Sequence, residues 1–575
     1  MMLAENCKTR YSVWYDIEGC TEPEAFAAEE LSRALRELTG ANFALITLPQ
    51  PEPAIIVGSP NYIKNKFGID LAAEDVGNEG FIIRTVGKDI VIAGGRPRGT
   101  LYGVYDFLER FCGCRWYTPT VKKMPFTLKL EVPDEIAVRE VPALEYRESF
   151  FCGNALDGEW SAHNRCNGQM PIMHAHQGGQ IKYFPFVHTF NALLSPDEYF
   201  DEHPEYFSMV DGKRVRERTQ LCLTNPDVVE IATKKVRQWI EEHPEATIIS
   251  VSQNDWYNPC TCPECSKIDE SEGSHAGSLI AFVNKIAENI EKDYPNIVID
   301  TLAYQYARTP PRTIRPRPNV CVRLCSIECC FAHPLDECDL VMSFGNRIHG
   351  ASFQKDLEGW SKVCDRLYIW DYVVNFHHYV MPFPNFGVLA PNIRYFIKNH
   401  VRGIFEEGST SQWGKTEFIE LKSWVIAKLL WNPYQDTMAL VEDFIRGYYG
   451  EAAEKVLEYF NLLQSRLDAS PESHFGIYDP PRTEYLRPQD IQKSFELFRE
   501  AKALAENEDI RERVFEAELP IRYWALLKAE KTPEREKAID EFHNDLVERN
   551  IMQITESVDL DESIDRLREG VIYRF

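Results

Sequence analysis

The sequence lacks the apolar segments that would place the chain in or across a membrane. Among its 575 residues there is no run of about 18 apolar residues, the length that a membrane-spanning helix needs. The amino-terminal segment MMLAENCKTRYSVWYDIEG has no uninterrupted apolar stretch of the kind that a signal peptide contains. We therefore expect a cytoplasmic protein, although a chain whose leader had been removed would show the same pattern.

Basic residues are also scarce relative to acidic ones. Lys and Arg total 63 against 89 Asp and Glu, which gives a formal net charge of −26. This balance argues against a nucleic-acid or anionic-membrane partner, because affinity for phosphate depends on clustered Lys and Arg. The hydrophobic share of 44% is nevertheless that of a globular protein, and the length favours two or three domains.

Two kinds of motif are missing as well. The glycines in IAGGRPRGT have neither the G-x-G-x-x-G nor the Walker spacing, so no phosphate-binding loop is indicated and no cofactor is expected in catalysis. The 16 cysteines show no regular framework spacing, which fits a reducing compartment better than a disulfide-stapled secreted domain.

The first segment, 1–142, has the pattern of a small α/β domain. EPEAFAAEELSRALRELTG (22–40) has apolar residues near helical spacing and ends on Gly40, a helix-stop signal. PAIIVGSP, GFIIRTVG and DIVIAGG are short β-rich runs, and RGTLYGVYDFLERFCGCRWYTP predicts a second helix and an exit strand. We interpret this segment as a packing domain without chemistry of its own.

Residues 143–414 alternate strand-like runs with helical or loop segments. The eight runs are LEYRESF (144–150), FPFVHTF (184–190), TQLCLTN (219–225), TIISVSQND (247–255), IVIDTLAY (297–304), NVCVRLCSIE (319–328), RLYIWDYVV (366–374) and VRGIFEEGS (401–409). Eight βα units predict a (β/α)8 TIM barrel, whereas a doubly wound open sheet would need fewer strands and a Gly-rich first turn. Residues 415–575 become purely helical in pattern and predict a helical carboxyl-terminal domain.

Nearly every predicted strand ends on a polar or acidic residue. These residues are Glu148, His188, Asn225, Asn254 with Asp255, Tyr304, Glu328, Asp371, and Glu406 with Glu407. Because barrel active sites lie at the carboxyl ends of the strands, we expect a pocket rich in carboxylates. Aromatic residues accompany these acids, namely Trp256, Tyr257, Tyr304, Tyr306, Trp370, Tyr372 and Trp413, with His377 and His378 close by. Aromatic faces stack on sugar rings and carboxylates bind hydroxyls, so the pattern favours glycoside hydrolysis, with a carbohydrate as the partner.

Three motifs resemble a known family. The S-Q-N-D…C-x-C-x-x-C block, IECCFAHPLDEC and AKLLWNPYQD…FIRGYYGEAA look like the catalytic region of glycoside hydrolase family 163. The EELSRAL helix and GTLYGVYDFLERFCGCRWYTP are similar to the small domain that precedes the barrels of β-hexosaminidases and α-glucuronidases. The resemblance implies a (β/α)8 barrel and an endo-β-N-acetylglucosaminidase-type activity.

The resemblance also implies residue roles. Related retaining enzymes use the acetamido oxygen of the substrate as nucleophile and carry a polar–acidic pair after the fourth strand. Asn254 would then orient the acetamido group and Asp255 would act as acid/base, with Glu328 as the other candidate acid. Asp371 and Glu406 would bind sugar hydroxyls or stabilise charge. The expected substrate-binding residues are Asn254, His188, Trp256, Tyr304, Trp370, His377 and Trp413.

Two alternatives stay open. An α-glucuronidase-like inverting hydrolase would use Glu328 as acid and Asp371 with Glu406 to activate water. A non-catalytic glycan-binding protein would use the same aromatic residues and would not need the acids.

A cysteine cluster follows Asp255 in the sequence. Cys260, Cys262 and Cys265 are spaced closely enough to bind one structural zinc ion, which normally has four protein ligands. The candidates for the fourth ligand are Cys325, Cys329, Cys330, Cys338, His275 and His333. Buried free thiols or a disulfide are the alternatives.

Overall fold

The computed structural model describes residues 1–575 except 48–49, 155, 343–351, 410–413, 481–484 and 571–575. The chain begins with a six-stranded sheet in the order β10-β5-β6-β4-β2-β3. Its strands are β2 (Ser12–Trp14), β3 (Leu45–Ile46), β4 (Ala54–Val57), β5 (Phe81–Val86), β6 (Asp89–Gly94) and β10 (Ala137–Glu140). Short ribbons β1 (Met2–Glu5) with β9 (Lys129–Glu131), and β7 (Arg115–Trp116) with β8 (Lys122–Lys123), flank it.

Both faces of this first sheet are buried, because apolar side chains that alternate along a strand pack into a core on each side. In β4, Ile55 and Val57 pack in the cluster formed with α1 (Glu22–Thr39) and α3 (Gly99–Cys112). Ile56 points to the other face and packs in the cluster that contains Ile63 of α2 (Pro60–Phe67). Successive strand residues point to opposite faces, so the apolar run of β4 needs helices or loops on both sides.

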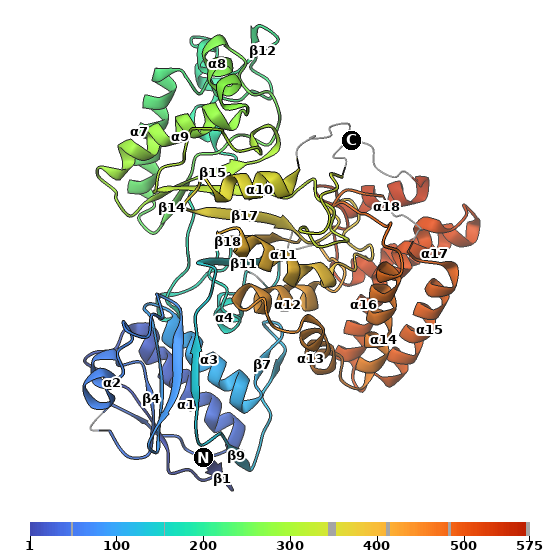
Figure 1. Ribbon diagram of the computed structural model, residues 1–575. Coiled ribbons are helices and arrows are strands. Elements are labelled where there is room, and N and C mark those ends of the chain that lie inside the picture. The colour runs from blue at the N-terminus through green and yellow to red at the C-terminus, as the bar shows by residue number, and fades with distance from the viewer. Residues whose placement is uncertain (48–49, 155, 343–351, 410–413, 481–484, 571–575) are drawn as a thin grey trace.

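A curled parallel sheet forms the centre of the molecule, and its strands run from teal at β11 through green and yellow to gold at β18 in Figure 1. Its order is β11-β18-β17-β16-β15-β14, so the first and last strands along the chain are neighbours, as in a barrel. The strands are β11 (Tyr146–Phe150), β14 (Ile248–Ser250), β15 (Val298–Ala303), β16 (Val320–Cys325), β17 (Leu367–Tyr372) and β18 (Val401–Glu407). Six of the eight predicted strand runs therefore contain a regular strand, and the sheet is a half-barrel rather than a regular eight-stranded one.

The two remaining runs form no regular strand. In 184–190, Pro185 offers no backbone N–H and His188 has a left-handed φ of 55°, both of which interrupt a ladder. Run 219–225 makes only an isolated bridge between Leu221 and Phe207. Irregular chain spans the gap between the sheet edges: Asn167 N–H donates to Arg147 O (3.1 Å), and Phe184 N–H donates to Ile248 O (3.0 Å).

Helices surround the curled sheet. The predicted helices 226–243 and 278–294 correspond to α7 (Pro226–Glu242) and α9 (Ala276–Glu291), and Asn225 caps α7 by accepting from Asp227 N–H. The other helices of this region are α4 (Gly158–His163), α5 (Phe190–Leu193), α6 (Pro196–Tyr199), α8 (Pro263–Glu272), α10 (Phe353–Ser361), α11 (Phe386–Lys398) and α12 (Ile419–Trp431). α12 follows β18 and packs on β11, where Ser149 Oγ donates to Ser423 O (2.8 Å).

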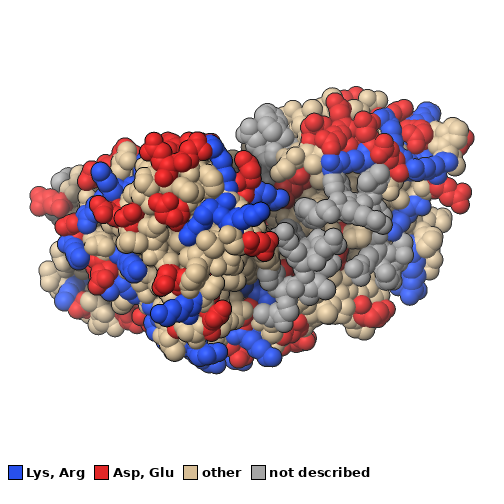
Figure 2. Space-filling view, turned by 90° about the horizontal axis from the view of Figure 1, so that it is seen from above, with Lys and Arg blue, Asp and Glu red and all other residues tan. Residues whose placement is uncertain are grey.

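The remaining helices stand beside the sheet, in orange to red in Figure 1. They are α13 (Thr437–Tyr449), α14 (Ala453–Asp468), α15 (Pro488–Leu504), α16 (Glu508–Lys528), α17 (Pro533–Glu548) and α18 (Leu560–Glu569). Within the described ranges, no helix has both the length and the apolarity to cross a membrane. In Figure 2 acidic and basic side chains are interspersed over the face seen from above.

Candidate active site

A cavity of about 210 Å³ opens at the carboxyl ends of the parallel strands. Its walls come from the last residues of β15 to β18, from the segments that follow β14, β15 and β16, from the irregular segment 184–190, and from two segments of the carboxyl-terminal helical region. The lining residues are His188, Asp255, Leu302, Tyr304, Cys325, Ile327, Trp370, Tyr372, Glu407, Tyr478 and Glu556. This is the end of a barrel-type sheet where active sites lie.

Asp255 stands at the solvated side of the cavity, with 58% of its side chain exposed. Tyr304 Oη donates a hydrogen bond to Asp255 Oδ1 (3.0 Å), and His188 Nε2 lies 4.0 Å from the same oxygen. His188 Nδ1 is 2.8 Å from Gln253 O, and since a carbonyl only accepts, the proton of the neutral ring sits on Nδ1. Nε2 is therefore the atom that faces Asp255 and the cavity.

Glu407, the last residue of β18, projects into the cavity from its buried side. Trp370 Nε1 donates to Glu407 Oε2 (2.7 Å). Burial raises the pKa of Glu407 to about 8, and the charges of Glu556 and Asp255 act in the same direction, while the Trp370 hydrogen bond opposes them. Glu407 therefore holds a proton at neutral pH.

Glu556 completes a trio of acids. Tyr478 Oη donates to Glu556 Oε2 (3.3 Å), and burial, followed by the charge of Asp255, raises the pKa of Glu556 to about 7. The loop after β17 holds the segments that carry these two residues, because Glu556 N–H donates to Phe376 O (2.8 Å) and Phe376 N–H donates to Ile477 O (2.7 Å).

Three of the acids predicted to be catalytic do not line this cavity. Asp371 and Glu406 are register partners on β17 and β18, one residue before Tyr372 and Glu407, so their side chains lie on the opposite face of the sheet. There Asp371 accepts a hydrogen bond from Ser326 Oγ, and Glu406 Oε2 has no hydrogen-bond partner among the described residues. Burial raises the pKa of Asp371 to about 6, and burial and Asp371 together raise the pKa of Glu406 well above its usual value.

Glu328, the other predicted acid, is engaged in a buried ion pair. Arg308 Nη1 lies 2.7 Å from Glu328 Oε2, and Arg308 Nε lies 2.8 Å from Asp356 Oδ2. Both members of the first pair are about 2% exposed, so the carboxylate of Glu328 faces a guanidinium rather than the cavity.

The predicted substrate-binding residues divide into two groups. His188, Tyr304 and Trp370 line the cavity. Asn254 is buried and braces the neighbouring loop, with Nδ2 donating to Asn191 Oδ1 (2.9 Å) and Thr219 O (3.0 Å). Trp256 Nε1 donates to the same carbonyl of Thr219 (2.8 Å).

Of the other two predicted contacts, only His377 lies among the described residues. His377 lies behind the cavity, where its Nδ1 is 3.0 Å from Tyr478 O, so it supports a lining residue. Trp413 lies outside the described residues.

Among the residues that line the cavity, the sequence predicts neither Tyr478 nor Glu556, and the predicted catalytic residues include Glu406 rather than Glu407. The strand-end pattern did include Glu407, and a strict count of side-chain alternation along β18 would have separated the two glutamates. No sequence signal marks Tyr478 or Glu556, because their place in the cavity depends on the packing of distant segments onto the loop after β17.

The cysteine cluster gains an unexpected member. Cys222 joins Cys260, Cys262 and Cys265, all four sulfurs lie within 4.8 Å of one another, and all four residues are buried. The Sγ atoms of Cys222 and Cys262 are 3.7 Å apart, and Cys260 Sγ accepts from Met209 N–H (3.4 Å). Four is the number of protein ligands that a structural zinc ion normally has, and the residue that the structure brings to the three predicted cysteines is Cys222 rather than one of the predicted candidates. All 16 cysteines are free.

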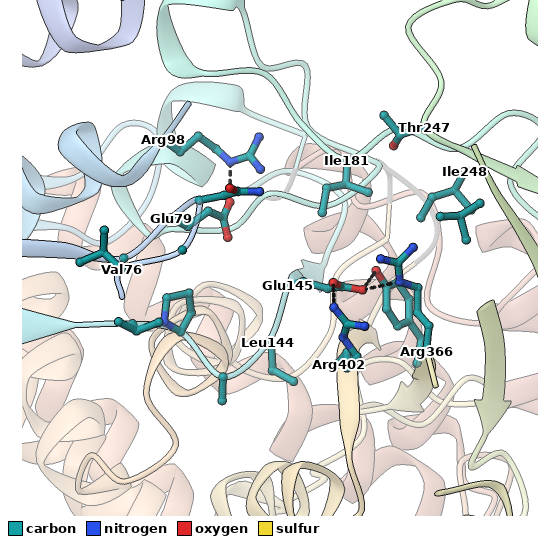
Figure 3. Close-up of a pocket in the computed structure, with 18 of the residues that line it drawn as sticks. Val76, Glu79, Arg98, Leu144, Glu145, Ile181, Thr247, Ile248, Arg366 and Arg402 are labelled. Atoms are coloured by element: carbon teal, nitrogen blue, oxygen red, sulfur yellow. Dashed lines mark hydrogen bonds and ion pairs between the residues drawn. The ribbon is translucent and has the colours of Figure 1, made fainter. Parts of the chain in front are cut away.

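A second cavity, of about 490 Å³, lies at the opposite end of the sheet (Figure 3). Figure 3 shows Glu145 between Arg366 and Arg402, with N–O distances of 2.9 and 2.7 Å, and Arg98 against Glu79. The labelled arginines are thus paired with carboxylates. Residues at the amino ends of barrel strands contribute to stability rather than to catalysis, so this cavity is not the candidate active site.

One solved structure supports the fold assignment. A family GH115 4-O-methyl-α-glucuronidase with specificity for decorated arabinogalactans is similar over 100% of this chain and 80% of its own, with a TM-score of 0.59 and 12% identity. At that identity the likeness shows a glycoside hydrolase-type fold alone. A family 89 glycoside hydrolase from Clostridium perfringens, in complex with GlcNAc-α-1,4-galactose, gives a TM-score of 0.48 at 12% identity over 95% of this chain and 71% of its own. A Streptomyces plicatus β-hexosaminidase in complex with GlcNAc gives 0.41 at 11% identity over 78% of this chain and 92% of its own.

Two protein-family models match this chain, one over its amino-terminal domain and one over the region of the curled sheet. A search of curated proteins gives no match. Residues 4–107 match the amino-terminal domain of glycosyl hydrolase family 67, in agreement with the predicted small domain. The resemblance to glycoside hydrolase family 163 stays a prediction. Residues 116–461 match the family described as domain of unknown function DUF4838, and because this match spans more than half of the chain, the protein belongs to the DUF4838 family.

Proposed function

We propose that this protein is a glycoside hydrolase whose reaction centre is the cavity that contains Asp255, Glu407 and Glu556. The observation that carries the proposal is the difference between two of these acids. Glu407 is 9% exposed and its raised pKa keeps it protonated at neutral pH, whereas Asp255 faces solvent and accepts a hydrogen bond. Glycoside hydrolysis needs one carboxyl group that donates a proton and one that supplies negative charge, and different environments create these two roles.

The roles follow from these environments. Glu407 donates its proton to the glycosidic oxygen as the bond from that oxygen to the anomeric carbon breaks. Asp255 then deprotonates the attacking water, attacks the anomeric carbon, or holds the acetamido group of the substrate while that group attacks. Glu556 lies within electrostatic reach of both and binds a sugar hydroxyl or tunes their charge. The aromatic walls Trp370, Tyr372 and Tyr478 supply flat surfaces for a sugar ring.

The charge of the cavity bears on the substrate class. Its described lining contains three acids and no Lys or Arg. A uronic acid would bring its carboxylate into this site without a cationic partner, so the lining favours an uncharged sugar over a glucuronide. We therefore rank β-N-acetylglucosaminides first. Asn254 is turned away, and the acetamido group would meet Asp255, Tyr304 and His188 instead.

A substrate panel tests this proposal. The purified protein is assayed with 4-nitrophenyl β-N-acetylglucosaminide, the matching β-N-acetylgalactosaminide, β-glucoside and α-glucuronide, and an N-glycopeptide that an endo-acting enzyme would need. We expect turnover of an N-acetylated substrate that is lost in Glu407→Gln and Asp255→Asn. Cleavage of the glucuronide alone would favour the α-glucuronidase alternative. Glycan binding without turnover, unchanged in both variants, would show a binding protein and overturn the proposal.

A further inference from the structure

A second cluster of metal-ligating side chains lies outside the cavity. Cys330, His333 and Cys338 come from the segment that follows β16, and His474 comes from the segment between α14 and α15. One ligand atom of each lies within 4.8 Å of the other three. The four residues are separate from the Cys222 cluster and bring together parts of the chain that are more than 130 residues apart, since Cys338 Sγ approaches His474 Nδ1 across a sequence separation of 136.

The distances fit one tetrahedral ion. With Zn–S near 2.3 Å and Zn–N near 2.0–2.1 Å, tetrahedral ligand atoms lie roughly 3.3–3.8 Å apart. Cys330 Sγ is 3.5 Å from His333 Nδ1 and 3.3 Å from His474 Nδ1, and Cys338 Sγ is 3.7 Å from His474 Nδ1. Three of the six distances between ligand atoms thus lie in the tetrahedral range, and the other three are at most 4.8 Å, so all four atoms can converge on one ion.

The protein also supplies an outer contact to the cluster. The backbone N–H of Ala332 donates to Cys330 Sγ (3.4 Å). Such contacts stabilise a thiolate and orient it as a ligand. Two thiolates and two neutral imidazoles balance the charge of a divalent zinc ion.

We infer that Cys330, His333, Cys338 and His474 form a structural zinc site of the Cys2His2 type. With four protein ligands the site is closed, so it has no open position for water or substrate and serves the fold rather than catalysis. The inference is independent of the Cys222 cluster and does not depend on the reaction proposed above.

The position of the site gives it a specific task. Ile327, three residues before Cys330, lines the cavity, and so does Tyr478, four residues after His474. Phe331 N–H donates to Phe475 O (2.9 Å), which is the backbone link between these two segments. A zinc ion beside this hydrogen bond would lock the Tyr478 segment of the helical region onto the loop of the sheet and so fix one wall of the cavity.

Zinc content per chain tests the inference without any assay of activity. The full-length protein is incubated with zinc, desalted, and analysed by elemental mass spectrometry and by native mass spectrometry. We expect Cys338→Ser and His474→Ala each to bind one zinc ion fewer per chain than the wild type. Cys262→Ser, in the other cluster, serves as the reference and keeps the ion held by the Cys2His2 site. Cys329→Ser is the matched control, since its thiol is buried next to Cys330 and does not belong to the cluster.

The same measurements can overturn the inference. A wild type that binds no zinc, or whose zinc is lost completely in Cys262→Ser, would contradict it. Equal zinc content in the wild type, Cys338→Ser and His474→Ala would contradict it as well, as would a Cys330–Cys338 disulfide in the purified protein. Should Cys338→Ser or His474→Ala fail to fold, cobalt titration of Cys262→Ser gives the count instead, because thiolate-bound tetrahedral cobalt has its own absorption. We expect one equivalent in that protein, held by the Cys2His2 site, and no such cobalt signal would contradict the inference.

Discussion

Trp370 donates its indole N–H to the carboxyl group of Glu407 across the neighbouring strands β17 and β18, at 2.7 Å. The register partner of Glu407 is Tyr372, so Trp370 lies two residues away on the same face of the sheet. The bond holds the carboxyl group toward the cavity. It favours the ionised form of Glu407, yet burial prevails and the pKa lies at about 8.

Replacement of Glu407 tests its role as the acid. Glu407→Gln keeps the shape of the side chain but has no proton to donate, so we expect turnover of the substrate found in the panel to fall by roughly 10²–10⁴-fold. Glu406→Gln is the matched control, because Glu406 lies one residue away on the opposite face, and its turnover should stay within a few-fold of wild type. The reverse result, with Glu406→Gln inactive and Glu407→Gln active, would restore the sequence-based assignment.

The same substitution should stabilise the protein, and more so at higher pH. The pKa of Glu407 is raised from 4.5 to about 8, so between these values the native state binds a proton that the unfolded chain has released. Stability of the wild type therefore falls as the pH rises through this window, by on the order of 3–5 kcal/mol at most. The amide introduced by Glu407→Gln does not titrate, so the denaturation midpoints of the wild type and this variant should diverge between pH 5 and pH 8. If the difference between the denaturation midpoints of the wild type and Glu407→Gln were the same at pH 5 and pH 8, Glu407 would not be held protonated.

The alkaline limb of the activity profile reports the same proton. Activity should fall as the pH rises through about 8, the pKa of Glu407, because this residue must be protonated to act as an acid. Trp370→Phe removes a donor that favours the ionised form, so the limb should move to higher pH. A mere loss of packing would lower activity at all pH values without moving the limb, and that result would argue against a positioning role for Trp370.

Pattern reasoning identified the edge of the curled sheet at which the cavity lies. Apolar runs that end in polar residues predicted six of the strands, and the same pattern placed Asp255, Tyr304 and Trp370 on the cavity side. It named Glu406, which lies one residue away from the cavity-lining Glu407, and because the period of a strand is two, a single-residue shift exchanges the two faces of the sheet. The sequence pattern therefore predicts the position of the strands better than it predicts the direction in which each side chain points.

Contacts between distant segments explain the rest. Tyr478 and Glu556 reach the cavity only because their segments hydrogen-bond to the loop after β17. Cys222 lies 38 residues before Cys260 and joins the thiol cluster through an irregular segment that was predicted to be a strand. Asn254 stands next to Asp255 in the sequence, as the predicted pair requires, but its side-chain amide donates its hydrogen bonds to Asn191 and Thr219 instead of facing the cavity. Such packing cannot be deduced from spacing along one chain.

The buried ion pair between Arg323 of β16 and Asp300 of β15 allows a test of stability. Arg323 Nη2 lies 2.8 Å from Asp300 Oδ2, both side chains are at most 2% exposed, and the guanidinium also lies 4.6 Å from the ring centres of Tyr183 and Phe186. Asp300→Asn leaves a buried charge without its partner and should cost about 3–5 kcal/mol in chemical denaturation. Asp293→Asn, which breaks the exposed pair with Arg237, should cost about 0–1 kcal/mol. Equal effects of the two substitutions would contradict this prediction.

Glu79 joins the amino-terminal sheet to the curled sheet through a buried ion triad. Arg147 Nη1 of β11 lies 2.7 Å from Glu79 Oε2, Arg98 contacts Oε1, and Asn167 Nδ2 donates to the same oxygen at 2.9 Å. Burial alone would raise the pKa of Glu79, but the two arginines outweigh it and hold the pKa at about 2. The stabilisation is thus present above the unfolded value of 4.5 and is lost as the pH falls toward 2.

Glu79→Gln should therefore destabilise the protein by about 3–5 kcal/mol at pH 7, because it leaves two buried guanidinium groups uncompensated. The difference in the free energy of unfolding between Glu79→Gln and the wild type should narrow by about 3 kcal/mol from pH 5 to pH 2, because Glu79 of the wild type takes up its proton in this range. Glu74→Gln is the control, since Glu74 forms a more exposed pair with Arg84 and should change stability by about 1 kcal/mol or less. If this difference in the free energy of unfolding stayed constant down to pH 2, the ionisation of Glu79 would not hold the two sheets together.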